Sequence, residues 1–163
     1  QHSAHERVEL ERLRSRSTER DVTIQKLLFP QTMEATVAEV ELVGRTAELL
    51  ARVGFEVEAF GKTTLAVKAV PAGIRHGDPA QLLAKLLAEW SADGAPSEEE
   101  RLDAMLAEIA CHSVVRAGDR LSASEAEALL RALDGVAHAD RGPHGRPILL
   151  RLPLAEIARR FGR

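Results

Sequence analysis

The sequence lacks several features that would place the protein in a familiar class. Its 163 residues include a single cysteine, Cys111, which excludes an intrachain disulfide framework and favours a reducing, cytoplasmic compartment. No apolar run approaches the length of a membrane span, so we expect no membrane partner. Neither a signal peptide nor an initiator methionine opens the chain, which we interpret as a fragment of a longer protein. No internal repeat, low-complexity tract or Walker-type glycine loop is present.

The residues that are present can form a sizeable core, because 45% are hydrophobic and 29% are charged. The net charge of −3 conceals an uneven distribution. Residues 31–110 contain 7 basic and 14 acidic residues, whereas residues 111–163 contain 9 basic and 6 acidic ones. The C-terminal arginines could line a phosphate-binding surface, with Arg146, Arg159 and Arg160 as candidate contacts. Charge alone slightly favours the simpler interpretation of a solvated terminal helix.

Hydrophobic periodicity and capping signals predict an α+β fold. We expect helices over residues 4–20, 35–53, 79–90, 98–115 and 123–135, with a last helix from Pro153 to Phe161. Strands are expected over 22–33 with a break at Pro30, over 148–152, and in a hairpin of residues 55–60 and 63–70. Capping boxes at Ser97/Glu100 and Ser122/Glu125 mark two helix starts, Gly54 marks a helix end, and residues 117–120 form a connecting turn.

Several side chains have the chemistry of metal ligands. His2 and Glu6 are four residues apart on the first expected helix, so they share one face and could hold a cation. A surface pair at this spacing is more often solvated than metal-bound, and Cys111 could equally be a small core residue. However, Cys111 adjoins His112, and His144 lies in a rigid loop rich in glycine and proline. Thiolate, imidazole and carboxylate together favour zinc or a similar transition ion.

Three segments resemble motifs of the MutL mismatch-repair family. The segment that begins at Gln1 resembles the family's endonuclease motif, and Gln1, His2, Glu6 and Glu11 keep its spacing. The segments Ala110-Cys111-His112 and Pro143-His144-Gly145-Arg146-Pro147 resemble the second and third motifs. All three occur in the family's order, so the resemblance covers essentially the whole chain, taken as the C-terminal domain of a bacterial member.

This resemblance implies a metal-dependent endonuclease that nicks one strand of duplex DNA. The implied metal ligands are His2, Glu6, Cys111 and His144, with His2 and Glu6 also catalytic. The implied cofactor is Zn²⁺ and/or Mn²⁺, which would activate a water molecule. ATP would bind only in a separate N-terminal region. Glu11 lies on the opposite helix face, where we expect it to pair with a basic residue.

Two positions depart from the family pattern. The aspartate that normally precedes the glutamine would fall just before Gln1, and nicking would depend on it. Gly142 stands where the third motif normally has a cysteine, which predicts weaker metal binding. This loss leaves open a dimerisation and clamp-docking module without nuclease activity of its own. A zinc-stabilised structural domain is a weaker alternative, because the helices and loops already promise an adequate core.

Residues 25–30 resemble the sliding-clamp-binding motif that the family carries at this place, and Gln25, Leu28 and Pro30 match it. Without the resemblance, the segment would be an edge strand whose apolar side chains join the core. The family further implies a homodimer that binds duplex DNA and the replication sliding clamp. A mismatch-recognition protein would bind the full-length chain, and the location would be cytoplasmic and nucleoid-associated.

The resemblance also implies two lobes. Residues 1–30 and 96–163 would form a dimerisation and endonuclease-site lobe, and residues 31–95 a smaller regulatory α/β lobe inserted into it. The acidic middle of the chain fits that insert.

Overall fold

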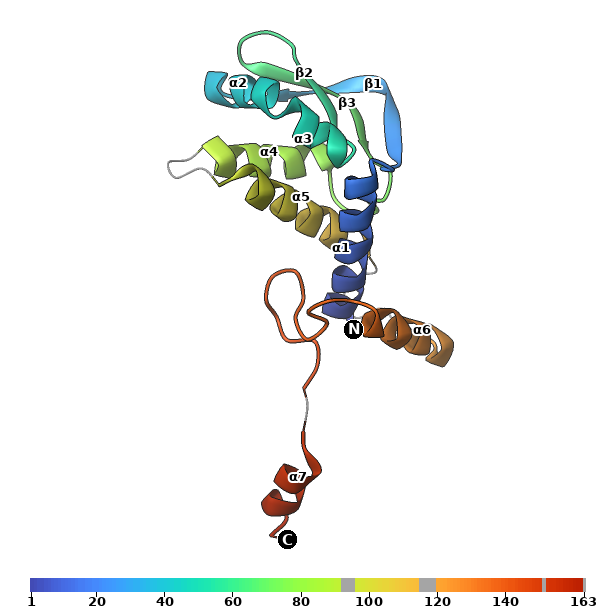
Figure 1. Cartoon of the computed structure of the whole chain (residues 1–163). Helices are drawn as coiled ribbons and strands as arrows, with labels where there is room; N and C mark the ends of the chain where they lie inside the picture. The colour runs from blue at the N-terminus through green and yellow to red at the C-terminus, as the bar shows by residue number, and fades with distance from the viewer. Residues whose placement is uncertain (92–95, 115–119, 151, 163) are drawn as a thin grey trace.

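The computed structural model describes residues 1–91, 96–114, 120–150 and 152–162 (Figure 1). Its helices are α1 (His2–Glu19), α2 (Val37–Arg45), α3 (Ala47–Arg52), α4 (Pro79–Ser91), α5 (Glu98–Ser113), α6 (Ala123–Asp134) and α7 (Leu154–Arg160). Its strands are β1 (Ile24–Glu34), β2 (Glu56–Ala59) and β3 (Thr64–Pro71). The α+β class is therefore confirmed, while most of the predicted turn at 117–120 lies outside the described residues.

The three strands form one antiparallel sheet in the order β1-β3-β2. The predicted hairpin is confirmed as β2 and β3, and its turn is closed by a hydrogen bond from the Phe60 N–H to the Thr64 carbonyl. The central strand β3 is almost wholly buried, as Leu65 and Val67 show, because α2, α3 and α4 lie against the sheet (Figure 1).

The register of β1 against β3 breaks at the predicted proline. Lys26 lies opposite Ala69 and Gln31 opposite Val67, so residues 27–30 form a bulge, called the β1 bulge below. Pro30 has no N–H to donate to the neighbouring strand, which accounts for the break. Within the bulge, Leu28 and Phe29 are 89% and 80% exposed, so the alternative interpretation, in which the apolar side chains of an edge strand join the core, is wrong for these two residues.

The helix predicted over residues 35–53 is two helices, because the chain turns at Thr46. The Thr46 hydroxyl donates to the Leu42 carbonyl at 2.8 Å, a contact typical of threonines that bend helices. A capping box of Thr36 and Glu39, which the sequence analysis missed, begins α2. The end of α3 agrees with the prediction, since Gly54 follows it with a φ of +97°.

Helix α1 contributes to two hydrophobic clusters. Leu10 belongs to the main core, which contains residues of α2, α3, α4, α5 and β3, whereas Ala4 and Val8 pack with Leu129 and Leu133 of α6. The two capping boxes predicted at Ser97 and Ser122 are both present and begin α5 and α6. The division into lobes at residues 30/31 and 95/96 stays a prediction. Residues of α5 share the main core with α2, α3, α4 and β3.

The C-terminal arm, residues 152–162, leads away from the rest of the molecule (Figure 1). The strand predicted over 148–152 is wrong for its described residues, which have no neighbouring strand edge; the nearest pairing is an isolated bridge between Arg141 and Pro147. Helix α7 is present as predicted, but none of its described residues is buried. Leu154 and Phe161 are more than three-quarters exposed.

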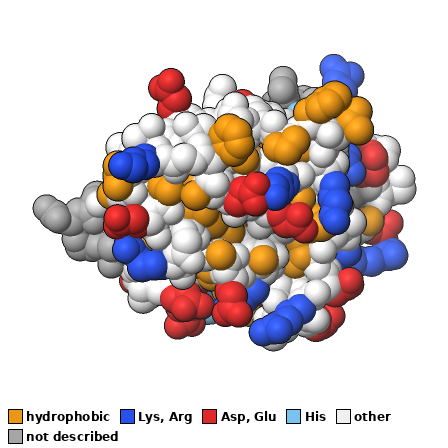
Figure 2. Space-filling model, turned by 90° about the horizontal axis from the view of Figure 1, so that it is seen from above, with side chains coloured by type: hydrophobic (Ala, Val, Ile, Leu, Met, Phe, Trp, Pro, Cys, Tyr) orange, Lys and Arg blue, Asp and Glu red, His pale blue; other side chains and the backbone are white. Residues whose placement is uncertain are grey.

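The surface over the sheet shows no large area of one charge. Figure 2 shows acidic and basic side chains interspersed with hydrophobic ones on this face. Among the described helices, none is both long and apolar enough to cross a membrane.

Candidate functional site

The first two predicted ligands lie on the first turns of α1. His2 begins this helix after Gln1, whose carbonyl accepts hydrogen bonds from the N–H groups of Ala4 and His5. The spacing of four residues brings His2 Nε2 to 3.1 Å from Glu6 Oε1. Glu6 is only 7% exposed, so its carboxylate lies on the inner face of the helix.

Cys111 lies in the last two turns of α5, which packs against α1. Burial is the main reason that the pKa of the Cys111 thiol is raised to about 12; a hydrogen bond to Glu6 and the charge of that carboxylate raise it further. The metal-free sulfur is therefore a protonated thiol that donates to Glu6. A metal ion would have to displace this proton before it could bind the sulfur.

His144 reaches the same place from the loop of residues 142–147. The Gly142 N–H donates to the Arg146 carbonyl at 2.7 Å, and the Gly145 N–H donates to the Gly142 carbonyl at 3.0 Å. Gly145 adopts a φ of +76°, which glycine tolerates without strain. This compact loop places His144 Nε2 3.0 Å from the Cys111 Sγ.

The four predicted ligands therefore form a connected series of contacts, from His2 through Glu6 and Cys111 to His144, called the four-residue series below. One thiol, one carboxylate and two imidazoles are donor types that zinc accepts. Among the described residues, however, no three His, Cys, Asp or Glu side chains are arranged so that they could hold one metal ion. The donor atoms of the series are thus of the kinds that bind zinc, but the side chains would have to move before they could bind one ion together.

Basic side chains of α1 lie beside this series and were missed by the sequence analysis. A cavity of about 300 Å³ is lined by His144 together with Arg7, Arg14 and Glu108. Arg7 is only 7% exposed and donates to the Ala137 carbonyl at 2.7 Å. The spacing from Glu11 could have revealed these arginines: Arg7 is four residues before it and Arg14 three residues after it, so all three share one helix face.

The predicted role of Glu11 is confirmed. Its Oε1 atom lies 3.0 Å from the Arg7 guanidinium and 2.9 Å from that of Arg14, so it pairs with basic residues as expected. Glu11 therefore helps to hold Arg7 and Arg14 beside the cavity.

The comparisons with known proteins identify the family. Residues 1–121 match the family model described as the MutL C terminal dimerisation domain. This chain belongs to that family. It is 42% identical to the DNA mismatch repair protein MutL of Phenylobacterium zucineum and 43% identical to that of Acidiphilium cryptum. Both alignments cover 100% of this chain but only 26% and 28% of the relatives, so it spans about a quarter of their length.

Within this MutL-family chain, Gly142, where the resemblance of the third motif implies a cysteine, lies close to the four-residue series. Gly142 packs against the start of α1, and a Cβ atom at this position would lie 3.1 Å from the Ser3 Cβ. A side chain at residue 142 would therefore point into the space between α1 and the His144 loop, and would need a small shift of one of them.

The predicted clamp-binding residues are all exposed. Gln25 lies opposite Val70 in the regular part of β1, while Leu28 and Pro30 belong to the β1 bulge. The bulge presents two large apolar side chains to solvent, as a binding segment would need.

The predicted phosphate contacts do not gather at one place. Arg146 is exposed on the His144 loop, whereas Arg159 and Arg160 are exposed on α7. Arg160 also pairs with Glu156 at 2.8 Å. Only Arg146 therefore adjoins the four-residue series.

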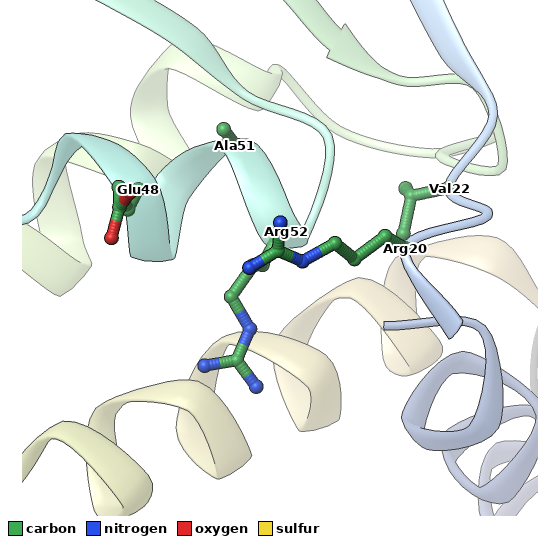
Figure 3. Close-up of a pocket in the computed structure, with 5 residues that line it drawn as sticks. All are labelled: Arg20, Val22, Glu48, Ala51 and Arg52. Carbon is green, nitrogen blue, oxygen red and sulfur yellow. The ribbon is translucent and has the colours of Figure 1, made fainter. Parts of the chain in front are cut away.

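A separate pocket of about 260 Å³ lies between the end of α1 and α3 (Figure 3). Arg20 and Arg52 reach into it from the C-terminal ends of their helices, and Glu48 lines another side. Arginines at helix C-termini interact favourably with the helix dipole, and Arg52 also lies 3.7 Å from Glu98. The positions of Arg20 and Arg52 are thus explained by favourable interactions with the helix ends, and in Arg52 also by the nearby Glu98 carboxylate.

Proposed function

We propose that this chain is the dimerisation and nicking module of a DNA mismatch repair protein, and that it cuts one strand of duplex DNA with a divalent metal ion. The four-residue series carries this proposal, because it joins residues that are more than a hundred positions apart in the sequence. The family to which the chain belongs and its curated relatives support the role in mismatch repair.

The proposed metal ligands are His2, Glu6, Cys111 and His144, and the proposed ion is Zn²⁺ or Mn²⁺. When bound, such an ion lowers the pKa of a water molecule and stabilises the charge that develops on the scissile phosphate. The Cys111 thiol, whose pKa is raised, must release its proton to solvent before the sulfur can become a ligand, and Glu6 stays a carboxylate. The aspartate expected before Gln1 would complete the catalytic residues.

The proposed DNA contacts are the arginines beside the series. Arg7 and Arg14 line the cavity next to His144, and Arg146 lies on the loop that carries this histidine. Guanidinium groups bind phosphate oxygens in a planar geometry, so these side chains would orient the phosphodiester. Arg159 and Arg160 would contact the backbone farther along the duplex.

The proposed partners are a second copy of the chain, the replication sliding clamp and, through the full-length protein, a mismatch-recognition protein. Exposed apolar side chains of the C-terminal arm, including Phe161, support the homodimer, because contact with a second copy would remove them from water. The exposed β1 bulge supports clamp docking. The proposed location is the cytoplasm, in association with the nucleoid.

A nicking assay tests the proposed activity. The chain, extended to include the aspartate expected before Gln1, is incubated with Mn²⁺ and supercoiled plasmid. We expect nicking by this protein and its loss in His2→Ala, Glu6→Gln and Cys111→Ala. Glu19→Gln, an exposed change at the other end of the same helix, should retain it. Nicking that survives all three substitutions would refute the proposed site.

A second candidate function is a dimerisation and clamp-docking module that does not cut DNA itself. One observation favours it: the described side chains do not converge on one metal position. The resemblance of the third motif adds to this, because it implies a cysteine where this chain has Gly142. A lack of nicking by the extended, unaltered chain, together with dimerisation and clamp binding, would support this alternative.

A further inference from the structure

The last turn of α5, which contains Cys111, is held by a distant loop, residues 72–78. The N–H groups of Arg75 and His76 donate to the His112 carbonyl at 2.9 and 3.1 Å. Carbonyls at the end of a helix have no partner within it and are commonly satisfied by the residues that follow. Here the chain continues in an extended conformation at Val114, and the loop supplies the donors instead.

The His112 side chain completes this contact. Its Nδ1 atom lies 2.8 Å from the His76 carbonyl oxygen, and because a carbonyl can only accept, Nδ1 carries the proton and donates. Gly77 packs against the same ring with a φ of +83°, and a Cβ atom there would lie 2.9 Å from Nδ1. The loop therefore contacts His112 through both backbone and ring.

The loop is itself anchored at both ends. The Ala72 N–H donates to the Thr23 carbonyl at 3.0 Å, where the loop leaves the sheet. At the other end, the Asp78 carboxylate accepts from the Ala80 N–H at 3.0 Å and so caps α4. The loop is thus attached to the sheet and to α4 and can serve as a fixed support for the end of α5.

We propose that His112 is a positioning residue that, together with loop 72–78, holds the last turn of α5 so that the Cys111 sulfur stays beside Glu6 and His144. Cys111 directly precedes His112, and its Sγ contacts depend on where this turn lies. The consequence for metal binding rests on the proposed function, whereas the positioning of the sulfur is independent of any metal.

Alkylation of Cys111 tests the positioning, because this residue is the only cysteine. Metal-free protein is treated with iodoacetamide under native conditions, and labelling is followed by mass spectrometry. Loss of one hydrogen bond predicts labelling about fivefold faster in His112→Ala. His112→Asn keeps a donor near the Nδ1 position and should label at about the wild-type rate. The exposed change Glu99→Gln is the control.

A matched pair of variants keeps this test decisive if His112→Ala does not fold. His112→Gln has the same amide as His112→Asn but displaces it by one methylene, so it should label faster than His112→Asn. Thermal denaturation of each variant identifies a temperature at which all are folded. Equal labelling of the Asn and Gln variants, or wild-type labelling of His112→Ala, would overturn the proposal.

Cobalt binding tests the consequence for the metal site. Co²⁺ is titrated into the extended chain, and the thiolate-to-cobalt absorption is recorded. Supporting residues around metal ligands typically change affinity by 10- to 100-fold, so we expect binding about tenfold weaker in His112→Ala and restored in His112→Asn. Unchanged binding in His112→Ala would overturn the role at the metal site. If the wild type gives no cobalt absorption, the proposed metal function fails, and the labelling rates alone decide the positioning.

Discussion

At the scale of single residues, the site depends on how a few side chains contact one another across α1, α5 and the His144 loop. Glu6 contacts both His2 and the Cys111 thiol, so it connects the two helices. Cys111 then contacts His144, which connects α5 to the loop. Removal of Glu6 should therefore separate the imidazole of α1 from the sulfur of α5.

Gly142→Cys should restore a soft donor at the position where the family motif has one. We expect Co²⁺ to bind about tenfold more tightly, which corresponds to about 1.4 kcal/mol. The new Cβ would lie 3.1 Å from the Ser3 Cβ, so the loop or the start of α1 must move apart slightly. Gly142→Ala crowds Ser3 equally but adds no sulfur and is the matched control. Equal cobalt affinities of the Cys and Ala variants would contradict this prediction.

At the scale of secondary-structure elements, helix starts are well determined and the β1 strand is interrupted. Three helices, α2, α5 and α6, begin with a reciprocal capping box. In contrast, β1 contains the β1 bulge, whose residues are not paired with β3 and whose Leu28 and Phe29 side chains are exposed. These elements therefore predict different responses to substitution: loss of stability at the caps, and loss of binding at the bulge.

The capping box of α5 predicts sensitivity to acid. Hydrogen bonds from the Ser97 N–H and hydroxyl lower the pKa of Glu100 below its ordinary value. A carboxyl group with a lowered pKa stabilises the fold above its unfolded-state pKa, and this contribution is lost as the pH falls through the folded-state value. Urea denaturation at pH 7 and pH 3 should therefore show a smaller loss of stability in Glu100→Gln than in the wild type. An equal loss in both proteins would contradict this role of Glu100.

Alanine at Gln25, Leu28 and Pro30 should abolish binding to the sliding clamp. Because all three side chains are exposed, the thermal unfolding temperature should change little. Binding is measured by titration of the purified clamp, and the exposed change Lys62→Ala on the β2–β3 turn is the control. Unchanged clamp binding by the triple variant would show that the bulge is only a structural irregularity.

At the scale of the whole molecule, a well-packed body is joined to an arm that lacks partners within the described chain. The main core is formed by α2, α3, α4, α5 and β3, whereas α7 buries none of its described residues (Figure 1). An apolar arm of this kind is typical of a surface that becomes covered in an assembly.

The chain should form a homodimer in solution. Light scattering at micromolar concentration should give about twice the chain mass of 17.8 kDa. Replacement of Leu154 and Phe161 by aspartate places charges on the exposed arm and should shift the mass towards the monomer. Leu28→Asp, an equally exposed change on the bulge, should remain dimeric. A wild-type monomer at high concentration would refute the dimer.

The sequence by itself determined the features that depend on neighbouring residues. Capping boxes at Ser97 and Ser122 and the helix end at Gly54 were predicted correctly, because these contacts join residues only a few positions apart. The i, i+4 contact of His2 with Glu6 was predictable for the same reason.

Only the tertiary structure decided which distant residues meet. The packing of α5 on α1 half-buries Cys111, and this desolvation raises the pKa of its thiol; neither effect is visible in the spacing of motifs. The outward β1 bulge and the absent strand at 148–150 depend on which strand edges are available as partners. A strand, a half-buried thiol and the contacts of His112 with loop 72–78 all require segments far apart in the chain to meet, so local pattern could not specify them.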